Sequence, residues 1–181
     1  LAYDGAKHVN ILQVAPELKN QTVLINGASK AYAMTGWRIG YALGSKEIIA
    51  QINKLQTHLT SNATSIAQWA AVGALKDGDA AVEEMRKAFE ERRKVILGLI
   101  RDMPYVKVRE PEGAFYVFID IRECPLADDL EFCERLLEEK LVAAVPGAAF
   151  FAPGFVRFSY ACSMENIKEG MGRLKEFLSG L

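Results

Sequence analysis

Two cationic side chains lie in a segment that otherwise contains no charge. Lys30 and Arg38 are the charged residues of the stretch TVLINGASKAYAMTGWRIGYALG, residues 22–44. A lysine amine is a nucleophile when its surroundings favour the neutral form, and a guanidinium binds a phosphate through two parallel hydrogen bonds. Because the segment supplies no acid, a ligand anion is a candidate partner. The alternatives are a surface lysine, and an ion pair between Arg38 and a distant carboxylate.

Small residues around the two cations strengthen the ligand interpretation. Ser29 places a hydroxyl beside Lys30, and Gly27, Gly36 and Gly40 allow the backbone to approach another group closely. The alanines and aromatic residues that flank Lys30 are expected to give its amine an apolar environment.

A third cation lies in an apolar segment near the end of the chain. In FVRFSYA, residues 155–161, Phe155, Arg157 and Ser159 share one face of an extended strand, and the apolar residues between them share the other. An arginine in so apolar a strand needs an anion. The residues alone leave an internal salt bridge, an edge-strand charge or a bound anion open.

The elements that must position Lys30 and Arg38 alternate between strand and helix. Strands are predicted at residues 22–26, as a buried β-branched run, and at 38–44; helices are predicted at about 45–59 and over 65–75. Asn62 or Thr64 would cap the second helix. The alternation indicates α/β layers.

A long amphipathic helix is predicted between residues 80 and 103. Apolar residues recur there at spacings of three, four and seven, at Val82, Met85, Phe89, Ile96, Leu99 or Ile100, and Met103. At 1.5 Å per residue the helix would be about 36 Å long, enough to join two domains. We therefore expect one domain part at residues 1–79, and the helix with a second, smaller domain at residues 80–181.

The second domain is predicted to mix strands and helices. Strands are expected at residues 114–121, 142–145 and 155–161, and helices after Asp128 and after Ser163. Asp128 precedes Glu131 by three residues, an acidic version of the capping-box spacing. The last helix has one apolar face, made of Ile167, Met171, Leu174 and Leu178.

Composition narrows the function classes. The 181 residues are 50% hydrophobic with a net charge of −1, which gives no footprint for nucleic acid or for a membrane surface. Cys124, Cys133 and Cys162 are widely spaced, and the chain has two histidines, so neither a disulfide framework nor a metal site is expected. A reducing cytoplasm is the expected location.

The segment GASKAYAMTGWRIG, residues 27–40, resembles the pyridoxal-phosphate attachment segment of class I aminotransferases, the aspartate aminotransferase family. The resemblance implies that Lys30 forms a Schiff base with the aldehyde of pyridoxal 5'-phosphate and acts as the catalytic base, and that Arg38 binds the cofactor phosphate. Many members carry a phosphate-binding serine where this chain has Gly27, and Ser29 is expected to take that role.

The C-terminal stretch from Val145 to Leu174 resembles the same family, and the resemblance implies that Arg157 binds the α-carboxylate of the substrate. Phe151 departs from the glycine common at its position. Residues 56–71 and 111–120 are also similar to family segments, and Thr57 stands where some aspartate-specific members carry an arginine. The implied fold is part of the large domain of a PLP-dependent transferase, joined by a long helix to a small α+β C-terminal domain.

The resemblance implies amino-group transfer between an L-amino acid and a 2-oxo acid by a homodimer. The chain begins at Leu1, and family residues that contact the cofactor ring are expected before this point. We therefore expect the C-terminal part of an aminotransferase, feebly active at best by itself. The alternatives are a C–S β-lyase on the same fold, and the ligand-sensing domain of a transcription regulator.

Overall fold

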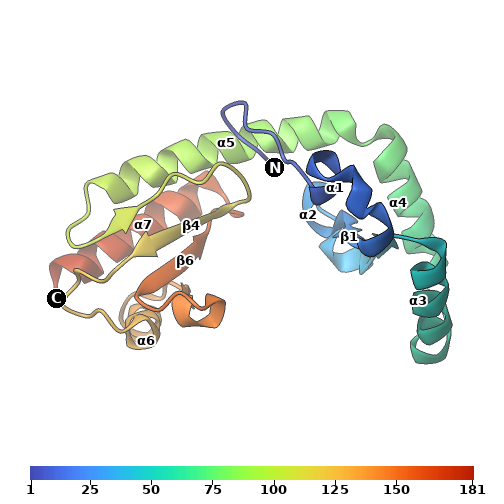
Figure 1. Cartoon of the computed structure of the whole chain (residues 1–181). Helices are drawn as coiled ribbons and strands as arrows, with labels where there is room; N and C mark the ends of the chain where they lie inside the picture. The colour runs from blue at the N-terminus through green and yellow to red at the C-terminus, as the bar shows by residue number, and fades with distance from the viewer. The chain divides into compact units, whose positions relative to one another are not determined.

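The computed structural model describes all residues from Leu1 to Leu181, which form two compact units. We call Lys7–Met85 the lysine unit, and Leu1–Ala6 together with Arg86–Leu181 the C-terminal unit. Helix α5 (Asp79–Arg101), coloured green in Figure 1, begins in the first and continues into the second. The boundary predicted between residues 79 and 80 thus falls six residues before that between the compact units.

The lysine unit contains short elements around a two-stranded ribbon. Its elements are α1 (Ile11–Val14), η1 (Pro16–Gln21), β1 (Leu24–Gly27), α2 (Ala28–Ala31), η2 (Thr35–Trp37), β2 (Gly40–Leu43), α3 (Lys46–Leu59) and α4 (Ser65–Asp77). Strands β1 and β2 pair antiparallel, with Leu24 opposite Leu43 and Gly27 opposite Gly40. The Ser45 hydroxyl accepts the Ile48 amide at the start of α3, which agrees with the helix predicted from about residue 45.

The prediction of a buried strand at residues 22–26 is wrong in its burial. Ile25, in the middle of β1, is 80% exposed. The ribbon has two strands and no further strand pairs with it, so its β-branched residues have no layer of this unit to pack against. A run rich in β-branched residues predicts a strand correctly but does not by itself predict what covers it.

The C-terminal unit is built on a four-stranded antiparallel sheet. Its strands are β3 (Lys107–Val108), β4 (Tyr116–Asp120), β5 (Val145–Pro146) and β6 (Phe155–Ser159), in the order β3-β4-β6-β5. The remaining elements are α6 (Asp129–Lys140), η3 (Gly147–Phe150) and α7 (Met164–Ser179). The strand predicted at residues 142–145 is shorter than expected and extends into Pro146, which lies on the sheet edge where a missing N–H costs no ladder bond.

The core of this unit lies on one face of the sheet. Alternate residues of the strands are buried there against the apolar stripes of the helices, namely Val117, Ile119, Val156, Phe158, Ile96, Ile100, Leu136, Ile167, Met171, Leu174 and Leu178. Ile100 is fully buried and Leu99 is exposed, which decides between the two residues offered by the periodicity of α5. The face of the last helix is confirmed in full.

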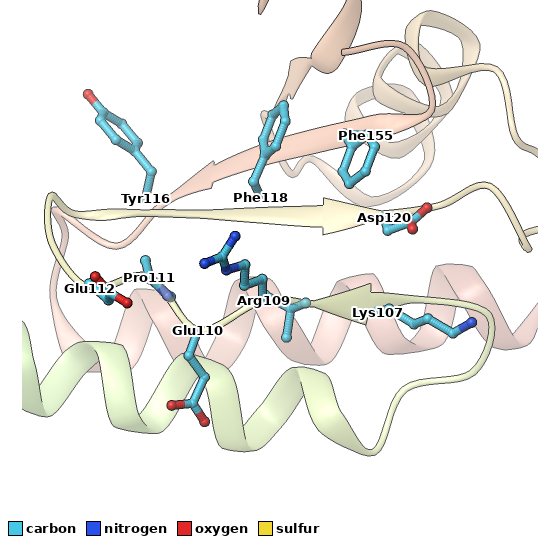
Figure 2. Close-up of a pocket in the computed structure, with 10 residues that line it drawn as sticks. Lys107, Arg109, Glu110, Pro111, Glu112, Tyr116, Phe118, Asp120 and Phe155 are labelled. Carbon is cyan, nitrogen blue, oxygen red and sulfur yellow. The ribbon is translucent and has the colours of Figure 1, made fainter.

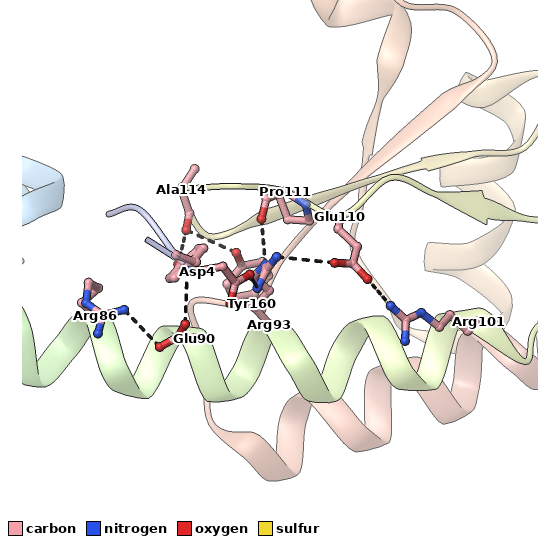
Figure 3. A network of polar contacts seen from close by, with 10 residues as sticks. Asp4, Arg86, Glu90, Arg93, Arg101, Glu110, Pro111, Ala114 and Tyr160 are labelled. Carbon is pink, nitrogen blue, oxygen red and sulfur yellow. Dashed lines mark hydrogen bonds and ion pairs between the residues drawn. The ribbon is translucent and has the colours of Figure 1, made fainter. Parts of the chain in front are cut away.

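Residues 1–6 are anchored to the C-terminal unit by a polar network (Figure 3). Buried Arg93 donates through Nε to the Pro111 carbonyl at 2.7 Å and through Nη1 to Asp4 Oδ2 at 2.7 Å. Tyr3, 1% exposed, lies under the Arg93 guanidinium and donates its hydroxyl to the Ala114 carbonyl. A backbone bridge joins Ala2 to Gly113. No helix of the structure combines the length and the apolarity that a bilayer crossing requires.

Candidate functional site

Lys30 and Ser29 lie directly after the first strand of the ribbon. Strand β1 ends at Gly27, and α2 follows with Ser29 and Lys30 in its single turn. The Lys30 side chain is exposed and that of Ser29 is half-buried. Because Lys30 is exposed, the expected apolar environment of its amine is not provided within the lysine unit.

Arg38 lies on the other side of the ribbon's end, just before β2. It ends η2 in the left-handed region, with φ 50° and ψ 47°, and its Nη1 donates to the Thr35 carbonyl at 2.9 Å. The Thr35 carbonyl is neutral, so it does not compensate the positive charge of Arg38. The guanidinium also keeps other N–H donors for a second acceptor. No acidic side chain of this chain forms an ion pair with Arg38.

The ribbon brings the three predicted residues of this unit together. Gly27 and Gly40 lie opposite each other, and helix α2 contacts η2, so the turn bearing Lys30 packs beside the turn that leads to Arg38. A Cβ on Gly40 would lie 3.0 Å from the Asn26 carbonyl oxygen. The glycine pair thus permits a close approach of the two strands at the end where the cations lie.

Arg157 lies in the C-terminal unit, on the open face of the sheet. Its strand β6 runs between β4 and β5, with Phe118 and Val145 opposite Arg157. The predicted alternation is confirmed, because Val156 and Phe158 are buried and Arg157 is half-buried on the other face. The edge-strand alternative is wrong, since β6 has a neighbour on each side.

Two aromatic rings enclose the Arg157 guanidinium. Its central carbon lies 4.3 Å from the ring centroid of Tyr116 and 4.5 Å from that of Phe150. Arg157 forms no ion pair with an acidic side chain, so the internal salt bridge that the sequence left open is also absent. Rings on the faces of a guanidinium leave its N–H edge as the direction in which it can bind an anion.

Sequence reasoning missed this aromatic pair. Tyr116 and Phe118 lie on the open face of β4, outside the core. The signal was present in YVFID, where the buried residues are Val117 and Ile119 at the alternate positions. Phe150 could not be found this way, because it reaches Arg157 from a loop.

A cavity of about 630 Å³ opens on the same face of the sheet (Figure 2). Figure 2 shows Tyr116, Phe118 and Phe155 projecting from β4 and β6 on this side, with Arg109 beside them. Phe118 and Phe155 stack at 5.3 Å between centroids. The cavity is also lined by Lys107 and by the carboxylates of Glu110, Glu112 and Asp120, so it combines apolar rings with charges of both signs.

Gly113 and Phe151 have backbone roles that the sequence only partly indicated. A Cβ on Gly113 would lie 2.6 Å from the Leu1 carbonyl oxygen, so this glycine admits residues 1–2 beside the strand rather than a turn alone. Phe151, where many family members carry glycine, adopts φ 57° and is 100% exposed. A phenylalanine in this region bears the steric cost that glycine avoids.

Comparisons with known proteins agree with the resemblance found in the sequence. The family profile described as aminotransferase class I and II matches residues 1–174. The chain is 47% identical over 182 residues to an aspartate aminotransferase of Bacillus subtilis, covering 98% of this chain and 46% of the relative. It is 44% identical over 182 residues to an asparagine–oxo-acid transaminase of Streptococcus mutans, with the same coverage of 98% and 46%.

A solved structure gives the same result for the fold. The aspartate aminotransferase from Rhizobium meliloti superposes with a TM-score of 0.92 at 40% identity, covering 98% of this chain and 47% of that one. The chain thus spans about half the length of the relatives it matches. It has the α/β fold of part of a PLP-dependent transferase.

Proposed function

Because the chain belongs to the class I and II aminotransferases, we propose that it serves amino-group transfer between an L-amino acid and a 2-oxo acid. Lys30 has the catalytic role, Arg38 and Ser29 hold the cofactor phosphate, and Arg157 binds the substrate α-carboxylate. The observation that carries the proposal is the pair of cations at one end of the β1–β2 ribbon, on a segment without a single carboxylate.

Members of the family depend on pyridoxal 5'-phosphate, and the residues of the lysine unit fit this group. An amine suits its aldehyde, while a guanidinium fork and a hydroxyl suit its phosphate. Gly36, close before Arg38, has no atom within 4 Å of the place where a Cβ would lie, so the turn is open at this position. Lys30, Ser29 and Arg38 are therefore the residues that would hold the cofactor.

The chain's own residues have separate tasks in this proposal. When bound, the cofactor withdraws electron density from the substrate α-carbon. The Lys30 amine takes the proton from that carbon and returns it, as a general base and acid. The Arg157 edge binds the carboxylate through two parallel hydrogen bonds, and the rings of Tyr116 and Phe150 restrict its rotation and exclude water.

The domain organisation and assembly belong to the same proposal. We take residues 1–79 as part of the large domain, and residues 80–181 as the long helix with the small domain. A homodimer is supported by the apolar side chains that the lysine unit leaves uncovered, among them Trp69 at 76% exposure. Three unpaired cysteines support a cytoplasmic location.

Borohydride reduction of the chain after incubation with pyridoxal phosphate tests the cofactor role. Peptide mass mapping should find one dominant pyridoxyl adduct, at Lys30. The adduct should disappear in Lys30→Arg and persist in Lys54→Arg, a control on an exposed lysine of the same unit. Arg38→Gln should raise the concentration for half-maximal labelling about 10-fold, because the phosphate loses its charged partner.

Equal labelling of Lys30, Lys46 and Lys54 would contradict the proposed site. So would a Lys30 adduct whose concentration dependence is the same in Arg38→Gln as in the parent chain. Both outcomes are read by mass alone and do not require turnover.

A further inference from the structure

The loop that carries Phe150 to Arg157 is closed on itself by its backbone. The Ala152 amide donates to the Gly147 carbonyl at 3.0 Å, and the Phe151 amide donates to the Ala148 carbonyl at 3.1 Å. A Cβ on Gly147 would lie 2.1 Å from the Ala152 carbonyl oxygen, so a larger residue cannot replace this glycine without opening the loop. We call residues 147–154 the arginine loop.

One buried carboxylate holds both ends of the arginine loop. Asp129, 7% exposed, accepts the Ala148 amide at 2.7 Å through Oδ2 and the Gly154 amide at 3.2 Å through Oδ1. Burial by itself raises the pKa of Asp129, but the backbone N–H groups of Ala148, Gly154 and Gly147 outweigh it and lower the pKa below its ordinary value. The carboxylate is therefore charged at neutral pH, and its acceptors are committed to this loop.

Asp129 is not needed to cap its own helix. Asp128 accepts the Leu130 and Glu131 amides at 3.0 and 2.9 Å and so provides the N-cap of α6. Glu131 does not complete the acidic capping box that the sequence predicted, because its amide donates to Asp128 while its side chain makes no bond back to the Asp128 amide. Two successive aspartates thus divide two tasks, the cap for the first and the loop for the second.

The arginine loop connects Asp129 to Arg157 through the side chain of Phe150. Phe150 lies between the two closing amides, and its ring centroid is 4.5 Å from the Arg157 guanidinium carbon. The same ring meets Phe118 edge-on at 6.1 Å. Tyr116 encloses the guanidinium from strand β4, independently of the loop.

We propose that Asp129 is a positioning residue for Arg157: by tying both ends of the arginine loop, it holds the Phe150 ring against the guanidinium and so fixes the edge that binds a carboxylate. The effect on carboxylate binding rests on the proposed function. The effect of Asp129 on the position of Phe150 against Arg157 does not. Asp129 itself touches neither Arg157 nor a ligand. Its replacement should change how Arg157 is presented while leaving the Tyr116 contact intact.

Side-chain NMR of Arg157 in the whole chain tests the structural part. Two rings this close to the guanidinium should place its Nε–H and Cδ–H resonances upfield of those of exposed arginines, and Arg157→Lys assigns them. Phe150→Leu should move these resonances part of the way downfield. Asp129→Asn should reproduce that shift, since the two loop N–H groups bond to different carboxylate oxygens and one of them would then face an amide NH2 donor. Asp128→Asn is the matched control and should leave them unchanged, because asparagine also caps a helix.

Titration with acetate, observed at the Arg157 Nε–H, tests the consequence. Asp129→Asn and Phe150→Leu should each raise the acetate Kd by about 3- to 10-fold, while Asp128→Asn keeps the parent value. If acetate fails to perturb Arg157 in the parent chain, the proposed carboxylate role fails, and the resonance positions still decide the role of Asp129.

Parent-like Arg157 resonances in a folded Asp129→Asn chain would overturn the proposal. If that variant does not fold, Asp129→Glu takes its place, since it keeps the charge and displaces the carboxylate by one methylene. The Arg157 resonances should then shift in a folded Asp129→Glu chain. Resonances at the positions of the parent chain would overturn the proposal in this variant too.

Discussion

The two units differ in how much of their apolar surface they bury. In the C-terminal unit a continuous core joins the sheet to three helices, and Ile100, Val117, Leu136, Val156 and Leu178 are each fully buried. In the lysine unit the buried apolar residues are Ala28, Met34 and Ala67, while large side chains stay outside, among them Leu59 at 78% exposure. Apolar burial supplies most of the free energy that opposes chain entropy, so only the C-terminal unit contains enough to fold by itself.

The same contrast separates the two parts of the candidate site. Arg157 is held by rings, by a central strand and by a loop with a buried carboxylate, all within the C-terminal unit. Lys30 and Arg38 lie on a two-stranded ribbon with exposed side chains. The Arg157 guanidinium is therefore held in place by its own unit, whereas the exposed Lys30 amine is not enclosed by its unit.

The largest effect expected from this contrast concerns local stability. Amide hydrogens of β4, β6 and α7 should exchange roughly 1,000-fold more slowly than those of the lysine unit, a difference of about 4 kcal/mol. Hydrogen exchange followed by mass spectrometry measures both units in one sample. Alkylation of Cys133 provides an independent check, because burial raises its pKa to about 11 and so keeps it unreactive until the C-terminal unit opens.

Equal protection in the two units would break the comparison. It would mean that the lysine unit gains stability from contacts other than its own buried side chains. Cys133 alkylation at the urea concentration where the lysine unit first opens would lead to the same conclusion.

The second effect compares one substitution on two helices. Leu136→Ala, on α6 at 0% exposure, should lower the free energy of unfolding of the C-terminal unit by about 3 to 4 kcal/mol. Leu55→Ala, on α3 at 64% exposure, should change stability by less than about 0.5 kcal/mol. Urea unfolding monitored by exchange of the relevant helix gives both values, and similar losses in the two variants would contradict the contrast.

The third effect concerns acid and the arginine loop. Because the pKa of Asp129 is lowered in the folded state, its ionised form stabilises the fold above about pH 4, and this contribution is lost as the pH falls through the folded pKa. Asp129→Asn should destabilise the C-terminal unit by about 2 kcal/mol at pH 7, and by progressively less toward pH 3. Urea unfolding at several pH values measures this, with Asp128→Asn as the control; a loss that is independent of pH would exclude the carboxylate charge as its cause.

The fourth effect tests how residues 1–6 are attached. Arg93→Met should cost about 1 to 2 kcal/mol, because it removes the bonds to Pro111 and Asp4 while the exposed Asp4 carboxylate remains hydrated. A double-mutant cycle with Asp4→Asn should give a coupling of about 1 kcal/mol. Exchange of the Tyr3 and Ala114 amides, which bond across this junction, reports the attachment directly; additive losses would show that the charge pair is not coupled.

The smallest effect is a gain in stability from removing an apolar residue. Phe151→Gly should stabilise the C-terminal unit by up to about 1 kcal/mol, because Phe151 has φ 57° and packs against nothing at 100% exposure. Phe151→Ala removes the ring but keeps the positive φ strain, so it should not reproduce the gain. Thermal unfolding distinguishes the two variants, and a loss with glycine would show that the ring has a contact that this structure does not contain.

The sequence predicted the positions of the helices and strands better than the burial and contacts of their side chains. Periodicity located α5 and α7, capping residues located the starts of α6 and α7, and alternation placed Arg157 on the open face. Burial of β1 was wrong, because β-branched composition reports strand propensity and not the neighbouring layer. The contact of Phe150 with Arg157 and the role of Asp129 depend on the conformation of the arginine loop, which contains Gly147 and Gly154. A local sequence pattern does not predict which distant residues such a loop brings together.

Residues 1–6 and residues 86–181 of this chain belong to one compact unit, and the lysine unit lies between them in the sequence. The chain leaves that unit after Ala6 and returns at Arg86, and the Asp4 amide lies 3.4 Å from Glu90 Oε1, so the exit and the return are close together. A segment with adjacent ends can be exchanged for a short flexible linker at a modest cost in loop-closure entropy. The C-terminal unit is therefore a scaffold that can be isolated with its arginine loop intact, and into which lysine-bearing segments of related chains can be grafted.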